Sequence, residues 1–159
     1  MQKKWLHAVP WDSVLSVNKA LCQAQKLEPS TKARSLEEAR AHWESAIHRS
    51  LSLKEVLDVC RECHEMAPFT FNNGNTFAAV GRTIIEEWTK ALPPVEGQIV
   101  QTTVSHYIAG LIGRRELLQV LKHFQDKLKP PTSTLREEAP AAPRAKADAP
   151  LLTEAQPQA

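Results

Sequence analysis

The stretch of sequence that decides the fold is residues 52–68, SLKEVLDVCRECHEMAP. Ser52 and Glu55 match a capping box, in which the serine hydroxyl accepts a backbone hydrogen bond and the glutamate reaches back to the serine N–H. Apolar side chains then recur every three or four residues until Pro68, which cannot continue a helix. They are Leu53, Val56, Leu57, Cys60 and Cys63. The pattern predicts an amphipathic helix that buries one face.

The same helical spacing occurs on the N-terminal side of this stretch, and no segment alternates as a β-strand would. It predicts a helix over about residues 12–27, with Asp12 or Ser13 as its N-cap. A further helix is expected from residue 35, because Ser35 and Glu38 match a second capping box.

Three more helices are predicted on the C-terminal side. The first should begin at Asn75 or Thr76, the second should cover about residues 98–112 with Gly113 as its C-terminal cap, and the third about residues 114–128. Residues 98–112 are apolar on more than one side, and such a helix is usually enclosed by others. We therefore predict an all-α fold, a compact bundle of five or six helices around a buried fifth helix.

Composition places this bundle in a single domain. The chain has 159 residues, 42% hydrophobic and 24% charged, which is ordinary for a globular protein. Residues 130–159 are rich in Pro and Ala and lack periodic apolar positions, so we predict a helical domain over residues 1–129 and a disordered tail after it. The chain has three cysteines, an odd number that fits a reducing compartment where thiols stay free. No apolar run follows Lys3 and Lys4 as in a signal peptide, and no apolar stretch is long enough to cross a bilayer. We therefore expect a cytoplasmic protein without membrane insertion.

Cys60-Arg61-Glu62-Cys63-His64 has the Cys-x-x-Cys-His spacing at which haem is attached covalently. The two thiols also make half of a tetrahedral zinc site, which would need two more ligands. The competing interpretation is that Cys60 and Cys63 are small core residues, since both continue the apolar stripe. We expect no cofactor, with haem and zinc as the alternatives.

A second candidate site is the loop over residues 69–76. Its asparagines and Gly74 stand just before a helix start, where free N–H groups favour anions and glycine permits close backbone approach. The same residue types are common in ordinary loops and caps. The proposed partner- or ligand-binding residues are Phe69, Phe71, Asn72, Asn73, Gly74, Asn75, Thr76 and, two turns later, Arg82.

The third candidate is the basic surface of the last helix. Residues 113–129 hold five basic and two acidic side chains, and Arg115, Lys122 and Lys129 recur at intervals of seven. With Arg114, they could hold phosphates of a nucleic acid, because backbone contacts need only well-placed cations. The alternative is a solvated outer face whose cations favour the C-terminal end of the helix dipole.

Catalytic arrangements are harder to find. The pairs Glu37-Glu38 and Glu86-Glu87 are adjacent and so point in different directions on a helix. We therefore predict a non-enzymatic helical interaction protein, an adaptor or subunit whose partner is another protein. Trp5 and Trp11 either pack on the bundle or belong to a partner surface. The alternatives are a nucleic-acid-associated subunit that uses the basic C-terminal helix and a haem or metal protein.

Overall fold

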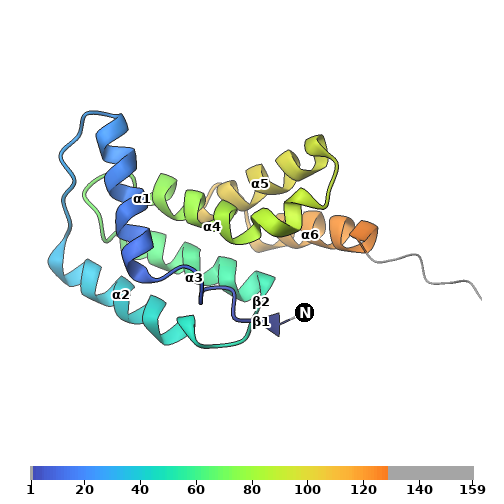
Figure 1. The fold of residues 1–159 in the computed structure, drawn as a ribbon, viewed down its shortest axis with the longest axis horizontal. Coiled ribbons are helices and arrows are strands. Elements are labelled where there is room, and N and C mark those ends of the chain that lie inside the picture. Colours follow the sequence, from blue (N-terminus) through green and yellow to red (C-terminus); the bar gives the residue numbers. More distant parts are fainter. Residues whose placement is uncertain (1, 129–159) are drawn as a thin grey trace, which may run out of the picture. The chain divides into compact units, whose positions relative to one another are not determined.

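The computed structural model describes residues 2–128, so the predicted tail and Lys129 lie outside the described residues. Six helices form the described part of the chain, together with one short antiparallel sheet (Figure 1). The all-α bundle is thereby confirmed. The elements are β1 (Gln2–Lys3), α1 (Trp11–Ala24), α2 (Ala33–Ile47), β2 (Leu51–Ser52), α3 (Leu53–Met66), α4 (Asn73–Lys90), α5 (Pro94–Ile108) and α6 (Arg114–Leu128).

The capping box that starts α3 is present as predicted. Ser52 Oγ accepts a hydrogen bond from Glu55 N at 3.3 Å, and Glu55 Oε2 accepts one from Ser52 N at 2.7 Å. The backbone hydrogen bond from Ser52 lowers the pKa of Glu55, because it stabilises the carboxylate. The helix ends at Met66, and the next residue, Ala67, has a left-handed conformation (φ 50°) that turns the chain toward Pro68.

Three other helix starts differ from the prediction. Helix α1 begins at Trp11 directly after Pro10, so neither Asp12 nor Ser13 is its N-cap. Helix α2 begins at Ala33, which places Ser35 inside the first turn instead of at a cap. The cause is a contact outside the helix. Lys32, the residue just before α2, donates its backbone N–H to Pro68 O at 2.9 Å and has extended backbone. The predicted second capping box is therefore wrong.

Helix α4 starts at Asn73, after Asn72 in a left-handed conformation, so Asn75 and Thr76 lie inside the helix instead of capping it. Asn72 makes no side-chain cap hydrogen bond.

Helix α5 is displaced toward the N-terminus by four residues. Pro94 occupies its first turn, where a proline loses no helical hydrogen bond. The helix ends at Ile108, and the left-handed residue after it is Gly110 (φ 78°), so Gly113 is not the predicted cap. One side of α5 is buried, at Val100, Val104, Tyr107 and Ile108, while Ile99 is 46% exposed on the outer side, so other helices do not enclose it all round as its apolar sequence predicts.

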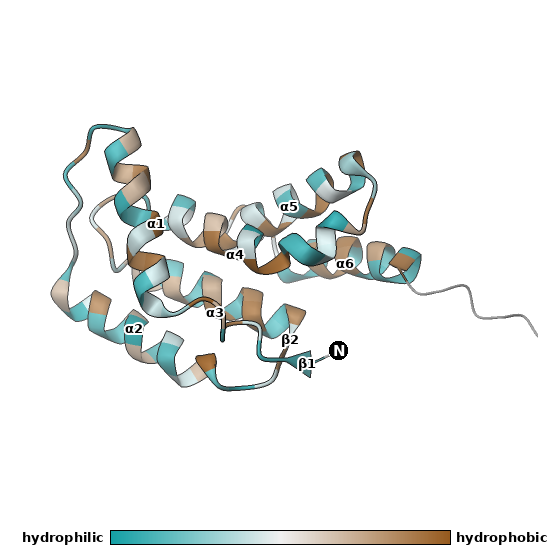
Figure 2. Ribbon diagram, viewed as in Figure 1, coloured by the Kyte–Doolittle hydropathy of each residue, from teal (hydrophilic) through white to brown (hydrophobic). Residues whose placement is uncertain are grey.

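Close backbone approach holds α4 and α5 together. At Gly81 a Cβ atom would lie 2.3 Å from Ile108 Cδ1, and at Gly97 it would lie 3.0 Å from the carbonyl oxygen of Thr89. Glycine at these two positions lets the helices touch. Helix α4 also packs against α1 and α3, and Figure 2 shows polar and apolar segments alternating along the helices, as amphipathic packing requires.

The N-terminal residues pack against the bundle, and Leu6 enters its core. Gln2 and Lys3 pair with Ser52 and Leu51 in the small sheet, a strand pairing that the sequence pattern did not predict. Trp5 Nε1 donates to Leu51 O at 3.0 Å, and Leu6 is 1% exposed. Trp5 therefore packs on the bundle.

An aromatic cluster occupies the space between α1, α2 and α4. The ring centroids of Trp11, Trp43 and Phe77 lie 6.2–6.4 Å from one another, and Phe69 lies 6.2 Å from Phe77. Trp11 is thus a core residue and not part of a free surface. Among residues 2–128, no helix combines the length and the apolar character that crossing a membrane would require.

Candidate functional site

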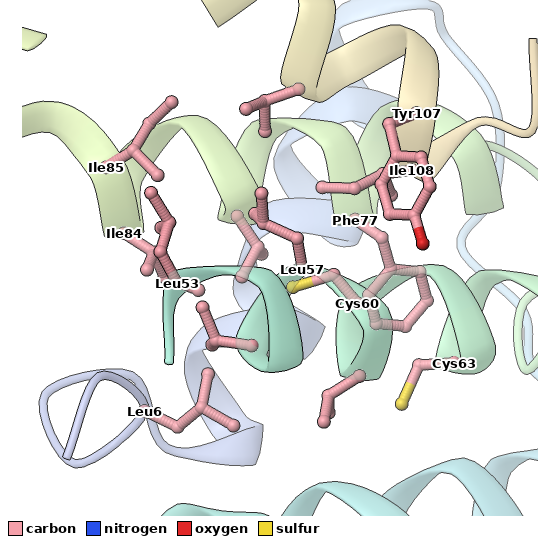
Figure 3. Close-up of a cluster of buried hydrophobic side chains, with 14 of the residues drawn as sticks. Leu6, Leu53, Leu57, Cys60, Cys63, Phe77, Ile84, Ile85, Tyr107 and Ile108 are labelled. Carbon is pink, nitrogen blue, oxygen red and sulfur yellow. The ribbon is translucent and has the colours of Figure 1, made fainter. Parts of the chain in front are cut away.

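The two cysteines of the Cys-x-x-Cys-His motif lie in the core. Figure 3 shows Cys60 beside Leu57 and Phe77, and both thiols come from fully buried residues. Burial raises the pKa of Cys60, and burial followed by the charge of Glu62 raises that of Cys63 to about 12. Thiolates are the form that binds metal or attacks electrophiles, so the geometry favours the packing interpretation of both residues.

His64 is the last residue of the Cys-x-x-Cys-His motif, but it does not complete a set of metal ligands with its neighbours in the described structure. Its Nδ1 atom is buried without a hydrogen-bond partner in the described structure, next to Gly74. Between residues 2 and 128, no three His, Cys, Asp or Glu side chains are grouped so that they could hold a metal ion.

The loop ahead of α4 is tied to α1 through Asn18. The Nδ2 atom of Asn18 donates to Phe71 O at 2.8 Å and to Thr76 Oγ1 at 3.0 Å. Asn18 is 3% exposed and Thr76 fully buried, so the bond between them is shielded from water, while the bond to Phe71 O is partly buried. The carbonyl and hydroxyl that could have faced a ligand are used inside the protein.

The loop asparagines are engaged in the same way. Asn73 bridges the backbone of Phe69, accepting from its N–H at 2.9 Å and donating to its carbonyl at 2.8 Å. Asn72 Nδ2 donates to Gln25 Oε1 at 3.1 Å, and Asn75 Nδ2 donates to Asn72 Oδ1. The left-handed residue is Asn72, not Gly74. The loop is therefore a structural clasp.

The remaining members of this candidate site point elsewhere. Phe69 is buried at 1% exposure, while Phe71 is 41% exposed. Arg82 donates to Ser105 Oγ on α5 at 2.8 Å and so links two helices. The structure does not bring Arg82 together with the loop.

A charged network that sequence reasoning missed holds α6 in place. Asp58, on α3, accepts from Tyr107 Oη at 2.5 Å, from Arg114 at 2.9 Å and from Lys54 at 3.0 Å. Burial, and then the hydrogen bond to Asp58, raise the pKa of Tyr107. Arg61 lies over the Tyr107 ring, 4.7 Å from its centroid. The network joins α3 to α5 and α6.

Two of the predicted phosphate-binding cations on α6 are still available for a partner. Arg114 is paired with Asp58, and Lys127 pairs with Glu96 at 2.6 Å. Arg115 and Lys122 are exposed and have no ion pair within residues 2–128. A step of seven residues turns a helix through about 700°, so the two side chains lie within roughly 20° of one another.

Leu118 lies between these cations and was missed by the sequence reasoning. It is 40% exposed and lies about 60° around the helix from Leu121, on the flank of the buried stripe of Leu117, Leu121 and Phe124. The surface forms an open depression, which we call the α6 outer face; it is lined by Arg114, Arg115, Leu118, Gln119 and Lys122. The available signal was a leucine outside the helical stripe.

Comparison with known proteins adds no relative: no family model, curated protein or solved structure matches the chain. The proposals below therefore rest on the chain's own residues.

Proposed function

We propose that this protein is a non-enzymatic helical interaction module that docks a partner protein on the α6 outer face. The observation that carries the proposal is the exposed Leu118 beside two cations, Arg115 and Lys122, which form no ion pair within residues 2–128. Elsewhere, the polar groups of the loop before α4 are already bonded to α1 and to one another. Interface centres typically combine an apolar anchor with arginine and a polar rim.

A protein partner fits this face better than a nucleic acid does. Half of the four α6 cations within the described residues are already paired with carboxylates, which leaves too few for strong phosphate binding. Leu118 would contribute nothing to a phosphate contact, whereas it could enter an apolar site on a protein.

Site-specific photo-crosslinking in the cells that make the protein tests the proposal. A photoreactive residue replaces Gln119 on the α6 outer face, and a control variant carries it at Gln23, exposed on α1. We expect a discrete protein adduct from position 119 and none from position 23. The adduct should vanish when Arg115→Glu and Lys122→Glu are added.

Nuclease treatment separates the partner classes. An adduct that resists nuclease and depends on both cations supports a protein partner. An adduct that nuclease removes would replace the proposal with nucleic-acid binding. The absence of an adduct at position 119, or an equal one at position 23, would refute docking at this face.

A further inference from the structure

The arrangement of groups on the α6 outer face also specifies the partner's chemistry. Resting on the proposed function, we propose that the docked segment is an acidic amphipathic helix with two carboxylates seven residues apart and a leucine-sized residue between them. Charge complementarity and spacing carry this inference.

The spacing follows from helix geometry. Arg115 and Lys122 are separated by about 10.5 Å along the α6 axis, at 1.5 Å per residue. A partner helix that lies along α6 presents Asp or Glu residues at the same separation when they stand at positions i and i+7. Both ion pairs can then form without bending either helix.

The apolar contact fixes the position between the charges. Leu118 stands three residues after Arg115 and four before Lys122, displaced to one side of the line that joins them. A leucine at i+3 or i+4 of the partner occupies the equivalent place and can cover Leu118. Burying this contact removes water from beside the two ion pairs, which strengthens them.

The spacing of the two cations and the neighbouring amide define the length of the contact. Gln119 lies on the opposite side of the line from Leu118, so its amide can form a polar rim. Arg115 and Lys122 stand seven residues apart on α6, so the contact they define covers about two turns of an acidic helix.

The test uses the full chain and three synthetic 16-residue peptides labelled with fluorescein. The first peptide carries Glu at i and i+7 with Leu at i+3 and i+4. The second has both leucines changed to Ala, and the third has both glutamates changed to Lys. Fluorescence anisotropy, with helicity of each peptide checked by circular dichroism, gives the dissociation constants.

We expect the first peptide to bind, with Leu118→Ala weakening binding by about five- to tenfold because the apolar anchor is lost. Arg115→Glu combined with Lys122→Glu should weaken it by more than about 30-fold, since attraction becomes repulsion. Two matched controls should change binding by less than about twofold, as expected for sites away from the contact. They are Val95→Ala, exposed on α5, and Lys19→Glu with Lys26→Glu, a charge change of the same size at and beyond α1.

The inference is overturned if the leucine-free or lysine-bearing peptide binds as tightly as the first, or if none of the three binds. It is also overturned if the control variants lower affinity as much as the α6 variants. The proposed function is judged separately, because a cation-dependent protein adduct from position 119 would persist with a partner of different chemistry. Loss of both the adduct and peptide binding would remove both proposals.

Discussion

Asn18 provides the most direct test of the loop before α4 as a structural clasp. Asn18→Ala removes the two hydrogen bonds that Nδ2 donates, of 2.8 Å to Phe71 O and 3.0 Å to Thr76 Oγ1, and the longer one that Oδ1 accepts from Cys22 Sγ at 3.8 Å. Both acceptors lose their donor at a site where Asn18 is only 3% exposed. A buried polar atom left unpaired costs about 1–3 kcal/mol, so the two together should lower the free energy of unfolding by about 2–6 kcal/mol.

Urea unfolding followed by tryptophan fluorescence measures this loss, because Trp11 and Trp43 are buried in the core that unfolds. Thermal unfolding should show a drop in Tm of roughly 10 °C, from about 3–5 °C per kcal/mol for a domain of this size. The slope of free energy against urea should stay unchanged, since the same surface is exposed on unfolding.

Asn75→Ala is the matched control, because Asn75 is exposed and its side chain, within the part of the chain that the structure describes, bonds only to Asn72 at 3.3 Å. We expect it to lower the free energy of unfolding by less than about 0.5 kcal/mol. If Asn18→Ala costs no more than this control, the loop is not held by Asn18. The polar groups of the loop would then have to be reconsidered as a free surface.

Three further predictions concern the core. Gly81→Ala should lower the free energy of unfolding, measured in urea titrations, by about 1–3 kcal/mol because the new methyl group would overlap Ile108. An unchanged urea midpoint would mean that α4 and α5 separate easily. Cys60→Ser should lower the free energy of unfolding by about 1 kcal/mol more than Cys63→Ser does. A hydroxyl at position 63 can donate to Ala39 O, which lies 3.6 Å from the native sulfur, whereas the Cys60 thiol has no hydrogen-bond partner within residues 2–128. Equal losses in urea unfolding of the two variants would contradict this difference. Because the pKa of Cys63 rises from 9.0 to about 12 in the folded state, its contribution to stability is complete below pH 9 and is lost as pH rises toward 12. The urea midpoint of the wild-type protein should therefore fall between pH 8 and pH 11. The midpoint of the Cys63→Ala variant should fall less steeply over the same range.

The sequence predicted those parts of the fold that depend on neighbouring residues. The capping box at Ser52 and Glu55 and the boundaries of α6 need only local hydrogen bonds and one apolar stripe. The start of α2 could not be predicted in that way, because it depends on a bond from Lys32 to Pro68, thirty-six residues away. The similar motif at Ser35 was a false signal for this reason.

The candidate site shows the same division. The seven-residue spacing of Arg115 and Lys122 can be seen in the sequence alone, and both side chains are exposed in the structure. Whether Arg114 belongs with them depends on Asp58, which is distant in sequence and reached only after α3, α5 and α6 have packed. A binding role for the loop asparagines stays a prediction, and their internal partners, above all Asn18, could not be predicted because they are far away in the sequence.

The pairing of β1 with β2 has a consequence for synthesis of the chain. Gln2 and Lys3 find their native partners only at Ser52 and Leu51, and Trp5 Nε1 bonds to the carbonyl of Leu51. During translation, residues 2–6 can reach their final place only after Leu51 and Ser52 have been made and have left the ribosome. Until then Leu6, which is 1% exposed in the folded protein, stays accessible to water, chaperones and proteases.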